Sequence, residues 1–412
     1  QTMFDDVSAE HWANGYINLA VSQGIIEGDG DGNFRPNAPI SYAEAMTIMV
    51  RATGYTVSAE ENGGYPHGYM KTGTSNGLAK NVQGSYSDKI SRGNVAYLTT
   101  NALESKLMEQ TGFGSDGKYE ITEKTLLKDK LKVTKDTGRI TAIENTSLTG
   151  SSSLAKGQIK IDNKTYETAY NMNNLLGYNV TYYVKNEGKN DESVILAMPI
   201  QNQNNDLTIS SELFSKLTTK NGNTAIEYFK DENTSKTNTA EISSDATLIY
   251  NGKYQAMDKS LIDLTDKSGN ITLLDSNKNG KYDIVFVKNY ENIVVDSVSS
   301  TGKIVDKYSQ KVLKLDDTVD FRITKGLEEI SVSDLAEYDV LSVAASLDKE
   351  LYEVEVTNKT VEGKETGKDS KGVLINGTKL RQTTPIQSTS AVRVYSILIQ
   401  TAKLRHLTHQ KL

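Results

Sequence analysis

The sequence predicts an α+β chain of several domains, in which helical repeats come first and tandem β-rich modules follow. Residues 1–108 carry apolar side chains at helical spacing, with loops between the helices. From about residue 119 onward, short stretches alternate apolar and polar side chains, and Asn-Gly, Ser-Gly and Thr-Gly pairs separate them. A length of 412 residues allows two to four domains of ordinary size.

The composition favours an exported protein. The chain has no cysteine, which is typical of proteins exported without disulfides, as in many Gram-positive surface proteins. No apolar run approaches the roughly 20 residues that span a bilayer, and no signal peptide precedes the folded-looking sequence, so we expect a mature chain or a fragment. The net charge of −7 argues against nucleic acid and anionic membranes as partners. The lack of a long apolar run argues against membrane insertion.

The helical part contains one helix–loop–helix unit used twice, over residues 1–55 and 56–110. In the first copy, residues 10–23 place Trp12, Tyr16, Ile17, Ala20 and Val21 on one helix face. Ser41 and Glu44 have the spacing of a capping box that opens a second helix, whose inward residues are expected to be Ala45, Ile48, Met49 and Ala52. In the second copy, helices are expected over 69–77 and from Ser91 onward.

The β-rich part is expected to form three related modules, at 119–200, 201–300 and 301–380. Three segments of similar sequence, 159–166, 248–254 and 373–380, are each predicted to belong to one module, and the last module is incomplete. Residues 381–412 form an atypical tail with basic and no acidic residues. Two interpretations of this tail stay open, a basic extension and a slip of the reading frame.

The first copy resembles a known repeat. Phe4-Asp5-Asp6-Val7, His11-Trp12-Ala13, Gly24-Ile25-Ile26, Asp31-Gly32, Phe34 and Pro36 stand in the order of an S-layer homology repeat. The second copy is more divergent and keeps Gly77-Leu78 and 90–94 of the pattern. The pairing of Tyr42-Ala43-Glu44 with the Gly-Gly-Tyr-Pro-x-Gly-Tyr segment at 63–69 resembles clostridial surface proteins of S-layer type.

The resemblance implies a wall anchor. In that family three repeats usually form one unit that binds a secondary cell-wall polysaccharide, often pyruvylated, so a third repeat upstream or a second chain is expected. An Arg at a helix start contacts the carboxylate of such a sugar. Carried over by position, Arg92 has this role, and Tyr42 stands where the first repeat should have its Arg. The polysaccharide-binding candidates are Arg92, Ser91, Trp12, Tyr42 and Glu44, although Trp12 also suits a core and Glu44 a helix cap.

One segment suggests a metal. Asp275, Asn277, Asn279 and Asp283 surround Gly280 in the D-x-N-x-N-G pattern of a calcium loop. The Glu expected at the twelfth position is replaced by Phe286, and alternating strands flank the loop, so the alternative is a plain hairpin turn. Calcium is the single cofactor that the sequence suggests.

No catalytic motif is convincing. Gly73-Thr74-Ser75-Asn76-Gly77 has the form of a nucleophile elbow, but it lies in the helical part without a preceding strand. We therefore expect a non-enzymatic, extracellular S-layer or cell-wall protein, whose β modules pack against neighbouring copies or act as a stalk. The alternatives are a wall-anchored hydrolase with its catalytic domain further downstream, and an adhesin whose β modules bind an external ligand.

Overall fold

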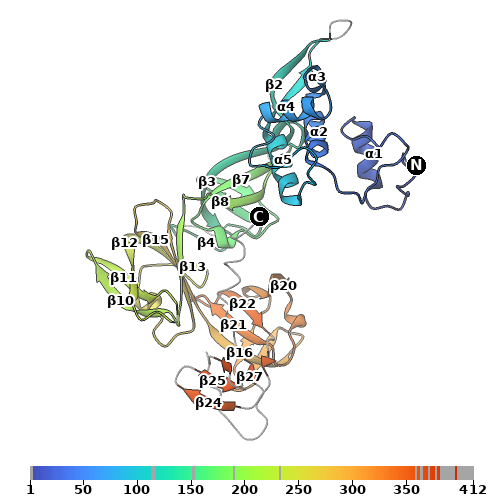
Figure 1. Ribbon diagram of the computed structural model, residues 1–412. Coiled ribbons are helices and arrows are strands. Elements are labelled where there is room, and N and C mark those ends of the chain that lie inside the picture. Colours follow the sequence, from blue (N-terminus) through green and yellow to red (C-terminus); the bar gives the residue numbers. More distant parts are fainter. Residues whose placement is uncertain are drawn as a thin grey trace. The chain divides into compact units, whose positions relative to one another are not determined.

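The computed structural model describes residues 3–112, 117–150, 154–188, 191–231 and 233–357, and beyond these the backbone of 360–361, 365–369, 372–375, 378–380 and 395–396. The chain forms two compact units (Figure 1). Unit 1 contains residues up to Thr134 together with 185–191, and unit 2 contains Lys135–Val184 and the chain from Glu192 onward. No helix in the described part of the chain is long and apolar enough to cross a membrane.

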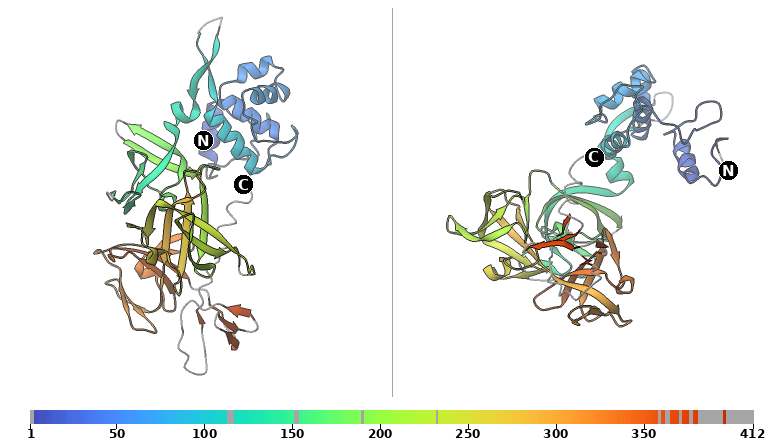
Figure 2. Two further views of the ribbon diagram at one scale, coloured as in Figure 1. Left: turned by 90° about the vertical axis from the view of Figure 1, so that its left-hand side faces the viewer. Right: turned by 60° about the horizontal axis from the view of Figure 1, so that its bottom comes forward.

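Unit 1 consists of helices and one β-hairpin. The helices are α1 (Asn14–Ser22), α2 (Tyr42–Ala52), α3 (Thr56–Glu61), α4 (His67–Ser75) and α5 (Arg92–Glu104). They are followed by the antiparallel pair β1 (Lys106–Gln110) and β2 (Tyr119–Thr125) and by the single turn η1 (Leu126–Lys130). The hairpin projects beyond the helices as a two-stranded ribbon (Figures 1 and 2). The predicted helix–loop–helix unit is present twice, and α3 is an addition that the sequence pattern did not indicate.

The core of unit 1 lies between α2, α4 and α5. Met46, Tyr69, Leu78 and Leu98 are almost fully buried there. Two glycines let the helices approach closely: a Cβ atom on Gly73 would lie 2.2 Å from the Met46 sulfur, and one on Gly68 would lie 2.1 Å from the carbonyl oxygen of Ala59. The backbone of α4 therefore contacts a side chain of α2 at Gly73 and the backbone of α3 at Gly68.

The buried faces of α1 and α2 differ from the prediction. On α2 the predicted Ala45 is buried together with Met46 and Val50, whereas Ile48, Met49 and Ala52 are only half-buried. The buried face of α2 contacts both α4 and α5, so it is rotated about the helix axis relative to the predicted face. On α1 the one buried residue is Ile17. Trp12 and Tyr16 are 82% and 72% exposed, so the expected apolar face of α1 is open on its Trp12 side.

Unit 2 contains three large sheets in chain order. The first has β3 (Val133–Ile143), β4 (Thr146–Ser147), β5 (Gln158–Ile161), β6 (Lys164–Glu167), β7 (Asn179–Gly188) and β8 (Asp191–Pro199). Its order is β4-β3-β5-β6-β8-β7, and an additional β3–β7 pairing closes it on itself. Its core includes Ile140, Ile159, Leu176 and Val180.

The second sheet has β9 (Asn205–Ser210), β10 (Phe214–Lys220), β11 (Asn223–Phe229), β12 (Thr237–Tyr250), β13 (Lys253–Gln255), β14 (Gly269–Asp275) and β15 (Tyr282–Asn289). The third has β16 (Glu291–Val298), β17 (Lys303–Asp306), β18 (Val312–Lys314), β19 (Asp320–Lys325), β20 (Glu328–Ile330), β21 (Val340–Ala345) and β22 (Leu351–Thr357). The third sheet thus begins at Glu291, inside the module that was expected to end at 300, because β15 and β16 follow each other with one residue between them.

The three sheets share one order of elements along the chain. A tight hairpin comes first (β5–β6, β12–β13 or β19–β20), then one helical turn (η2, Asn173–Leu175; α6, Lys259–Ile262; η3, Val332–Asp334), then a pair of neighbouring strands, which is antiparallel in the second and third sheets. A buried leucine follows each helical turn: Leu176, Leu264 and Leu335. In the second and third sheets the last strand of the pair runs parallel to the first strand of the hairpin. The β part is therefore a tandem array of one unit.

This repeat corrects the expected assignment of the segment 373–380. The hairpin of the third module is β19–β20, so the third module is complete by Thr357. The similar segment downstream forms its own antiparallel pair, β25 (Gly372–Ile375) with β26 (Thr378–Leu380), beside β24 (Glu365–Asp369). The short strands β23 (Thr360–Val361) and β27 (Tyr395–Ser396) also pair. Apart from β27, the tail predicted at 381–412 and its suspected frame slip lie outside the described residues.

Polar contacts tie the three sheets of unit 2 together. Arg139 of the first sheet forms a 2.9 Å ion pair with Asp283 of the second. Asn251, in the β12–β13 turn, donates to the carbonyl oxygen of Ala345 in the third sheet at 2.6 Å. Lys253 pairs with Asp348 and Glu350 of the third sheet at 2.6 and 2.7 Å. These contacts hold the modules of unit 2 in a defined arrangement.

Candidate functional site

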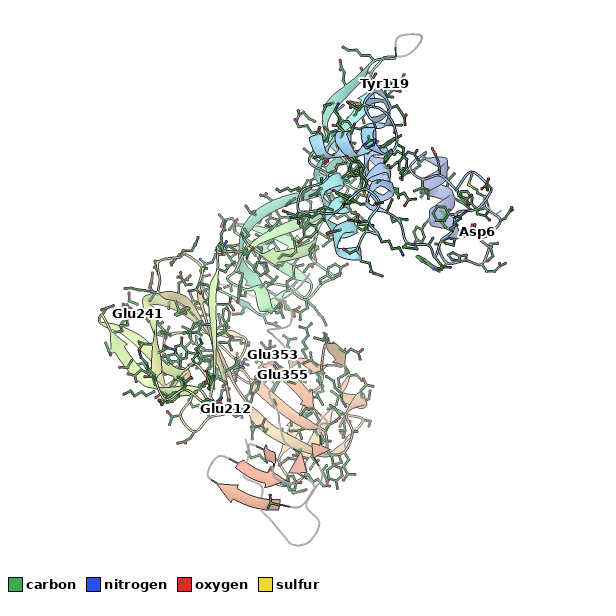
Figure 3. All side chains as sticks on the ribbon, viewed as in Figure 1. Asp6, Tyr119, Glu212, Glu241, Glu353 and Glu355 are labelled. Carbon is green, nitrogen blue, oxygen red and sulfur yellow. The ribbon has the colours of Figure 1, made fainter. Side chains whose placement is uncertain are left out.

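The first repeat is organised by carboxylates that accept backbone amides. Asp6 accepts from the amides of Phe34 and Arg35 at 2.8 and 2.6 Å, and the pKa of its carboxyl is lowered, chiefly by the Phe34 amide (Figure 3). Asp29 accepts from the amides of Asp31 and Asn33 at 2.9 and 3.1 Å. The Asp-rich loop of the motif is thus explained by loop closure, because each carboxylate replaces a backbone partner.

The starts of α2 and α5 meet in the structure. Ser41 and Lys89 form an isolated antiparallel bridge, and the amide of Ile90 donates to the carbonyl oxygen of Ile40 at 3.1 Å. The segments that precede the two helices therefore run side by side. This brings together the two positions at which the family resemblance predicts ligand-binding side chains.

The start of α2 is closed. Ser41 and Glu44 form the predicted capping box: the Ser41 hydroxyl accepts from the Glu44 amide, and the Glu44 carboxylate accepts from the Ser41 amide at 2.6 Å. The amides of Tyr42 and Ala43 donate to the carbonyl oxygens of Asp88 and Tyr86 at 2.9 and 3.0 Å. Every amide of this first turn that could hold an anion is already used.

Two of the binding candidates therefore have other functions. Glu44 serves the helix cap, as the alternative interpretation of the sequence had it. Tyr42 is only 5% exposed and belongs to the core of unit 1, so its ring offers no surface to a sugar. Burial also raises the pKa of its hydroxyl. Tyr42, which stands where the resemblance implies an Arg, thus lies in the core of unit 1.

The start of α5 is open. Ser91 caps the helix by accepting from the Asn94 amide at 3.2 Å. No described residue accepts a hydrogen bond from the amides of Arg92 and Gly93, and both residues are exposed. The Arg92 guanidinium makes no ion pair with any described residue. A free cation and two free amides at the start of a 13-residue helix form the donor set that a carboxylate needs.

Several aromatic side chains of unit 1 are accessible, among them Trp12 and Tyr86. Trp12 is 82% exposed and stacks on His11 with ring centroids 6.0 Å apart. Tyr86, which the sequence did not single out, is 40% exposed and contacts His67 edge to face at 5.4 Å. Tyr86 lies in the loop whose carbonyl groups close the start of α2, and the Ser85-x-x-Asp88 turn that shapes this loop was the available signal.

The loop expected to bind calcium is closed by its own hydrogen bonds. Asp275 is buried and accepts from the amides of Lys278 and Gly280 at 2.7 and 3.0 Å. Asp283 accepts from the amide and hydroxyl of Ser276 and pairs with Arg139. The side-chain oxygens of Asn277 and Asn279 each accept an amide two residues on. These hydrogen bonds account for the shape of the loop without a bound ion, and each carboxylate oxygen keeps a lone pair that could coordinate a cation, so calcium binding here stays a prediction.

The nucleophile-elbow pattern has a packing explanation. Gly73 lies inside α4 against Met46, and Gly77 follows the helix end with a φ of 78°, which ends helices in the usual left-handed conformation. Ser75 is the exposed last residue of α4, and no strand precedes it. Among the described residues, no group of three or more His, Asp or Glu side chains could hold a metal ion.

Comparison with known proteins identifies the first helical repeat. A model of the S-layer homology domain matches residues 4–46. This region is an S-layer homology domain. The match covers the loop closed by Asp6 and Asp29 and the capping box of α2, whereas the start of α5 lies outside it.

Similarity extends over much of the chain. It is 25% identical to a surface layer protein of Brevibacillus choshinensis over 414 aligned positions, covering 88% of this chain and 36% of that protein. A cell surface protein of Thermoanaerobacter kivui is 26% identical, covering 82% and 40%. A middle cell wall protein of Brevibacillus brevis is 29% identical over 222 positions, covering 47% and 21%. The chain spans less than half the length of these relatives.

The domain and these similarities together indicate an S-layer-type protein located outside the cell, at the cell wall. The sequence-based expectations of an α+β fold with β-rich modules and of a cell-surface location are confirmed.

Proposed function

We propose that the chain belongs to the structural part of a surface layer and is held to the wall by its S-layer homology region, which binds a secondary cell-wall polysaccharide. The observation that carries the proposal is the contrast between the two helix starts. The start of α5 offers Arg92 and two unused amides, whereas every amide in the first turn of α2 is used. An acidic sugar, such as a pyruvylated one, fits the open start because its carboxylate can accept from the guanidinium and the amides together.

The roles of the individual residues follow from their positions. Arg92 contacts the carboxylate, and Ser91 holds the helix start in place through its bond to the Asn94 amide. Trp12, with its exposed indole, offers a flat surface to a sugar face. Tyr42 and Glu44 support the fold of the site and do not touch the ligand. Neighbouring copies of the protein are the second partner, and the β modules pack against them or form a stalk.

A non-enzymatic function is supported by the packing explanation for Gly73 and Gly77 and by the names of the relatives, which describe surface layer and cell wall proteins. Neither the hydrolase nor the adhesin alternative gains a specific observation in its favour at the helical site.

Binding to purified cell walls tests the proposal. The full chain is sedimented with walls that retain the polysaccharide and with walls stripped of it. We expect binding to the first and not the second. Arg92→Ala should weaken binding about 10- to 100-fold, the effect of losing charged hydrogen bonds. Lys71→Ala, which removes one exposed positive charge from α4, is the matched control and should bind normally.

Equal binding of the unaltered chain to stripped walls would refute the anchor. Normal binding by Arg92→Ala on intact walls would refute the assignment of the carboxylate contact, since the helix start is the only part of the site that this variant alters. Arg92→Lys keeps the charge but loses the planar fork of donors, and we expect intermediate binding.

A further inference from the structure

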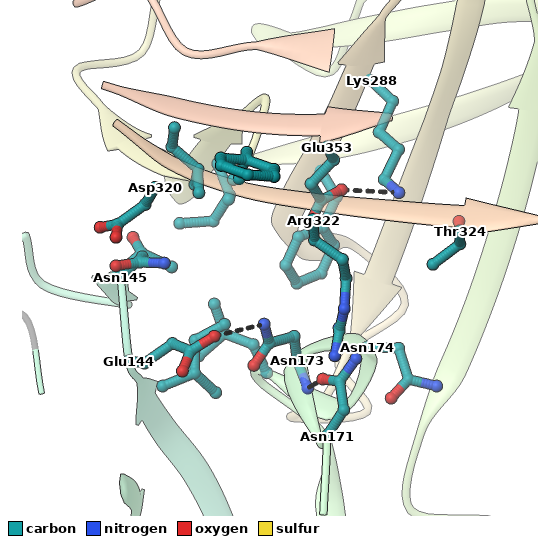
Figure 4. A pocket seen from close by; sticks show the side chains of 18 of the residues that line it. Glu144, Asn145, Asn171, Asn173, Asn174, Lys288, Asp320, Arg322, Thr324 and Glu353 are labelled. Carbon is teal, nitrogen blue, oxygen red and sulfur yellow. Dashed lines mark hydrogen bonds and ion pairs between the residues drawn. The ribbon is translucent and has the colours of Figure 1, made fainter. Parts of the chain in front are cut away.

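Unit 2 contains a pocket that the wall-anchor function does not use. It has a volume of about 530 Å³, within the range of small-molecule binding sites. All three sheets contribute to it: Asn145 and Asn174 come from the first module, Phe286 and Lys288 from the second, and Asp320 and Phe321 from the third. Figure 4 shows Asp320 beside Asn145, with Arg322 extending toward the asparagines of the first module.

The pocket is held open by contacts made within the protein. Lys288 pairs with Glu353 at 2.8 Å, and Tyr290 donates to Glu355 at 3.0 Å; both carboxylates lie side by side on β22 (Figure 3). Burial alone would lower the pKa of Lys288, but the two glutamates outweigh it and raise this pKa, so the lysine stays charged. The Lys253 and Asn251 contacts tie the second and third sheets together as well. A site fixed in this way needs little reorganisation to bind.

Several polar side chains in the pocket have no partner among the described residues, and three of them are uncharged or acidic. In the described part of the chain, nothing hydrogen-bonds to the side chains of Asn145, Asn174 or Asp320, whereas the neighbouring Asn173 donates to Glu144 at 3.5 Å. The three side chains come from two modules that are far apart in the sequence and face one cavity. They present both donors and acceptors to whatever fills it.

Two of the cationic side chains in the lining are paired within the protein. Lys288 is neutralised by Glu353, and Arg322 by Glu329 outside the pocket, at 2.8 Å in each case. The side chains left to a ligand are therefore the amides of Asn145 and Asn174, the carboxylates of Asp320 and Glu144, and the exposed Lys156. Phe321, Leu351 and Ile143 add apolar surface beside them. This mixture suits a molecule with hydroxyl groups, an amide and a small apolar group.

We propose that this pocket binds a neutral, N-acetylated saccharide. The hydroxyl groups of the sugar bond to Asp320 and Asn145, as carboxylate and amide groups bind vicinal hydroxyls. The acetamido group provides an amide for Asn174 and a methyl group for the apolar wall. The pocket lies in the β modules of unit 2, so this inference does not rest on the wall-anchor proposal for unit 1.

Calorimetric titration of the full chain with tetra-N-acetylchitotetraose tests the proposal, with cellotetraose as a sugar of equal length that lacks acetamido groups. We expect saturable binding of the first and at least fivefold weaker binding of the second. Asp320→Ala and Asn145→Ala should each weaken binding about five- to tenfold, the effect of one or two lost hydrogen bonds. Asp317→Ala removes an exposed carboxylate just outside the pocket and should leave binding unchanged.

Asn174→Trp places a large side chain at an exposed pocket position without altering the core, and we expect it to abolish binding. Arg92→Ala should have no effect, so the two proposals fail independently. If neither sugar at about 10 mM produces a binding signal, the inference is overturned. Unchanged binding by all three pocket variants would overturn it as well. Equal affinity for the two sugars would overturn the N-acetyl specificity.

Discussion

Replacing Gly68 by alanine should destabilise unit 1, and the structure sets the size of the effect. The new Cβ would lie 2.1 Å from the carbonyl oxygen of Ala59 and 3.2 Å from the carbonyl carbon of Asn62. Both atoms belong to backbone, so no side chain can rotate away, and α3 and α4 must separate by about 1 Å. Overpacking of this kind costs about 1–3 kcal/mol, and the better helix propensity of alanine returns up to about 1 kcal/mol. We expect a net loss of about 1–2 kcal/mol.

Gly15 provides a matched control. Like Gly68, it is the second residue of a nine-residue helix, but nothing lies within 4 Å of its Cβ position. Gly15→Ala should therefore stabilise the chain by about 0.5 kcal/mol through helix propensity alone. Urea unfolding of the full chain is followed by the helical circular dichroism signal, which reports on unit 1 because α6 has only four residues. Equal urea midpoints for the two variants would refute the close-packing argument.

Three further predictions concern unit 2. Asp275→Ala should lower the free energy of unfolding of unit 2 by about 2–3 kcal/mol, because two backbone amides lose their acceptor; an unchanged melting temperature would contradict this. If the loop binds calcium, millimolar calcium should raise the melting temperature of the unaltered chain but not that of Asp275→Ala. Asn251→Ala should cost more than Asn251→Gly by about 1 kcal/mol in thermal melts, because the position has a φ of 44°, although both lose the bond to Ala345. Burial alone would raise the pKa of Asp348, but Lys253 and Ser346 outweigh it and lower the pKa to about 2. Its stabilisation is therefore present above the unfolded pKa of about 3.9 and is lost as the pH falls toward 2, so Lys253→Met should move acid unfolding of unit 2 to higher pH.

Local signals in the sequence predicted local structure well. The Ser41 and Glu44 spacing gave the capping box that the structure shows. The similar segments 159–166 and 248–254 both form hairpins, with Ile161 opposite Lys164 and Tyr250 opposite Lys253. In each case the residues that decide the conformation are neighbours in the chain, so their pattern is sufficient.

Features that depend on distant segments were not predictable in the same way. The hairpin of the third module turns at Gly326 and Leu327 and lacks the Asn-Gly pair, so the repeat was placed one hairpin too late. The closed start of α2 depends on carbonyl groups of Tyr86 and Asp88, which any residue type could supply. Burial of Tyr42 follows from the same contact. The pocket of unit 2 exists because three modules meet, and no single segment encodes it.

The strand order of the second and third modules has a mechanical consequence. In each module the first and last strands of the β9-β14-β15 and β16-β21-β22 triplets run in the same direction, with an antiparallel strand between them. A stretching force on the chain acts on the two outer strands of a triplet at opposite ends. The force therefore runs along the strands and shears many hydrogen bonds at once. Only Tyr290 separates the two triplets, so the load passes from one module into the next with almost no slack. We therefore expect such an array to resist stretching along the chain.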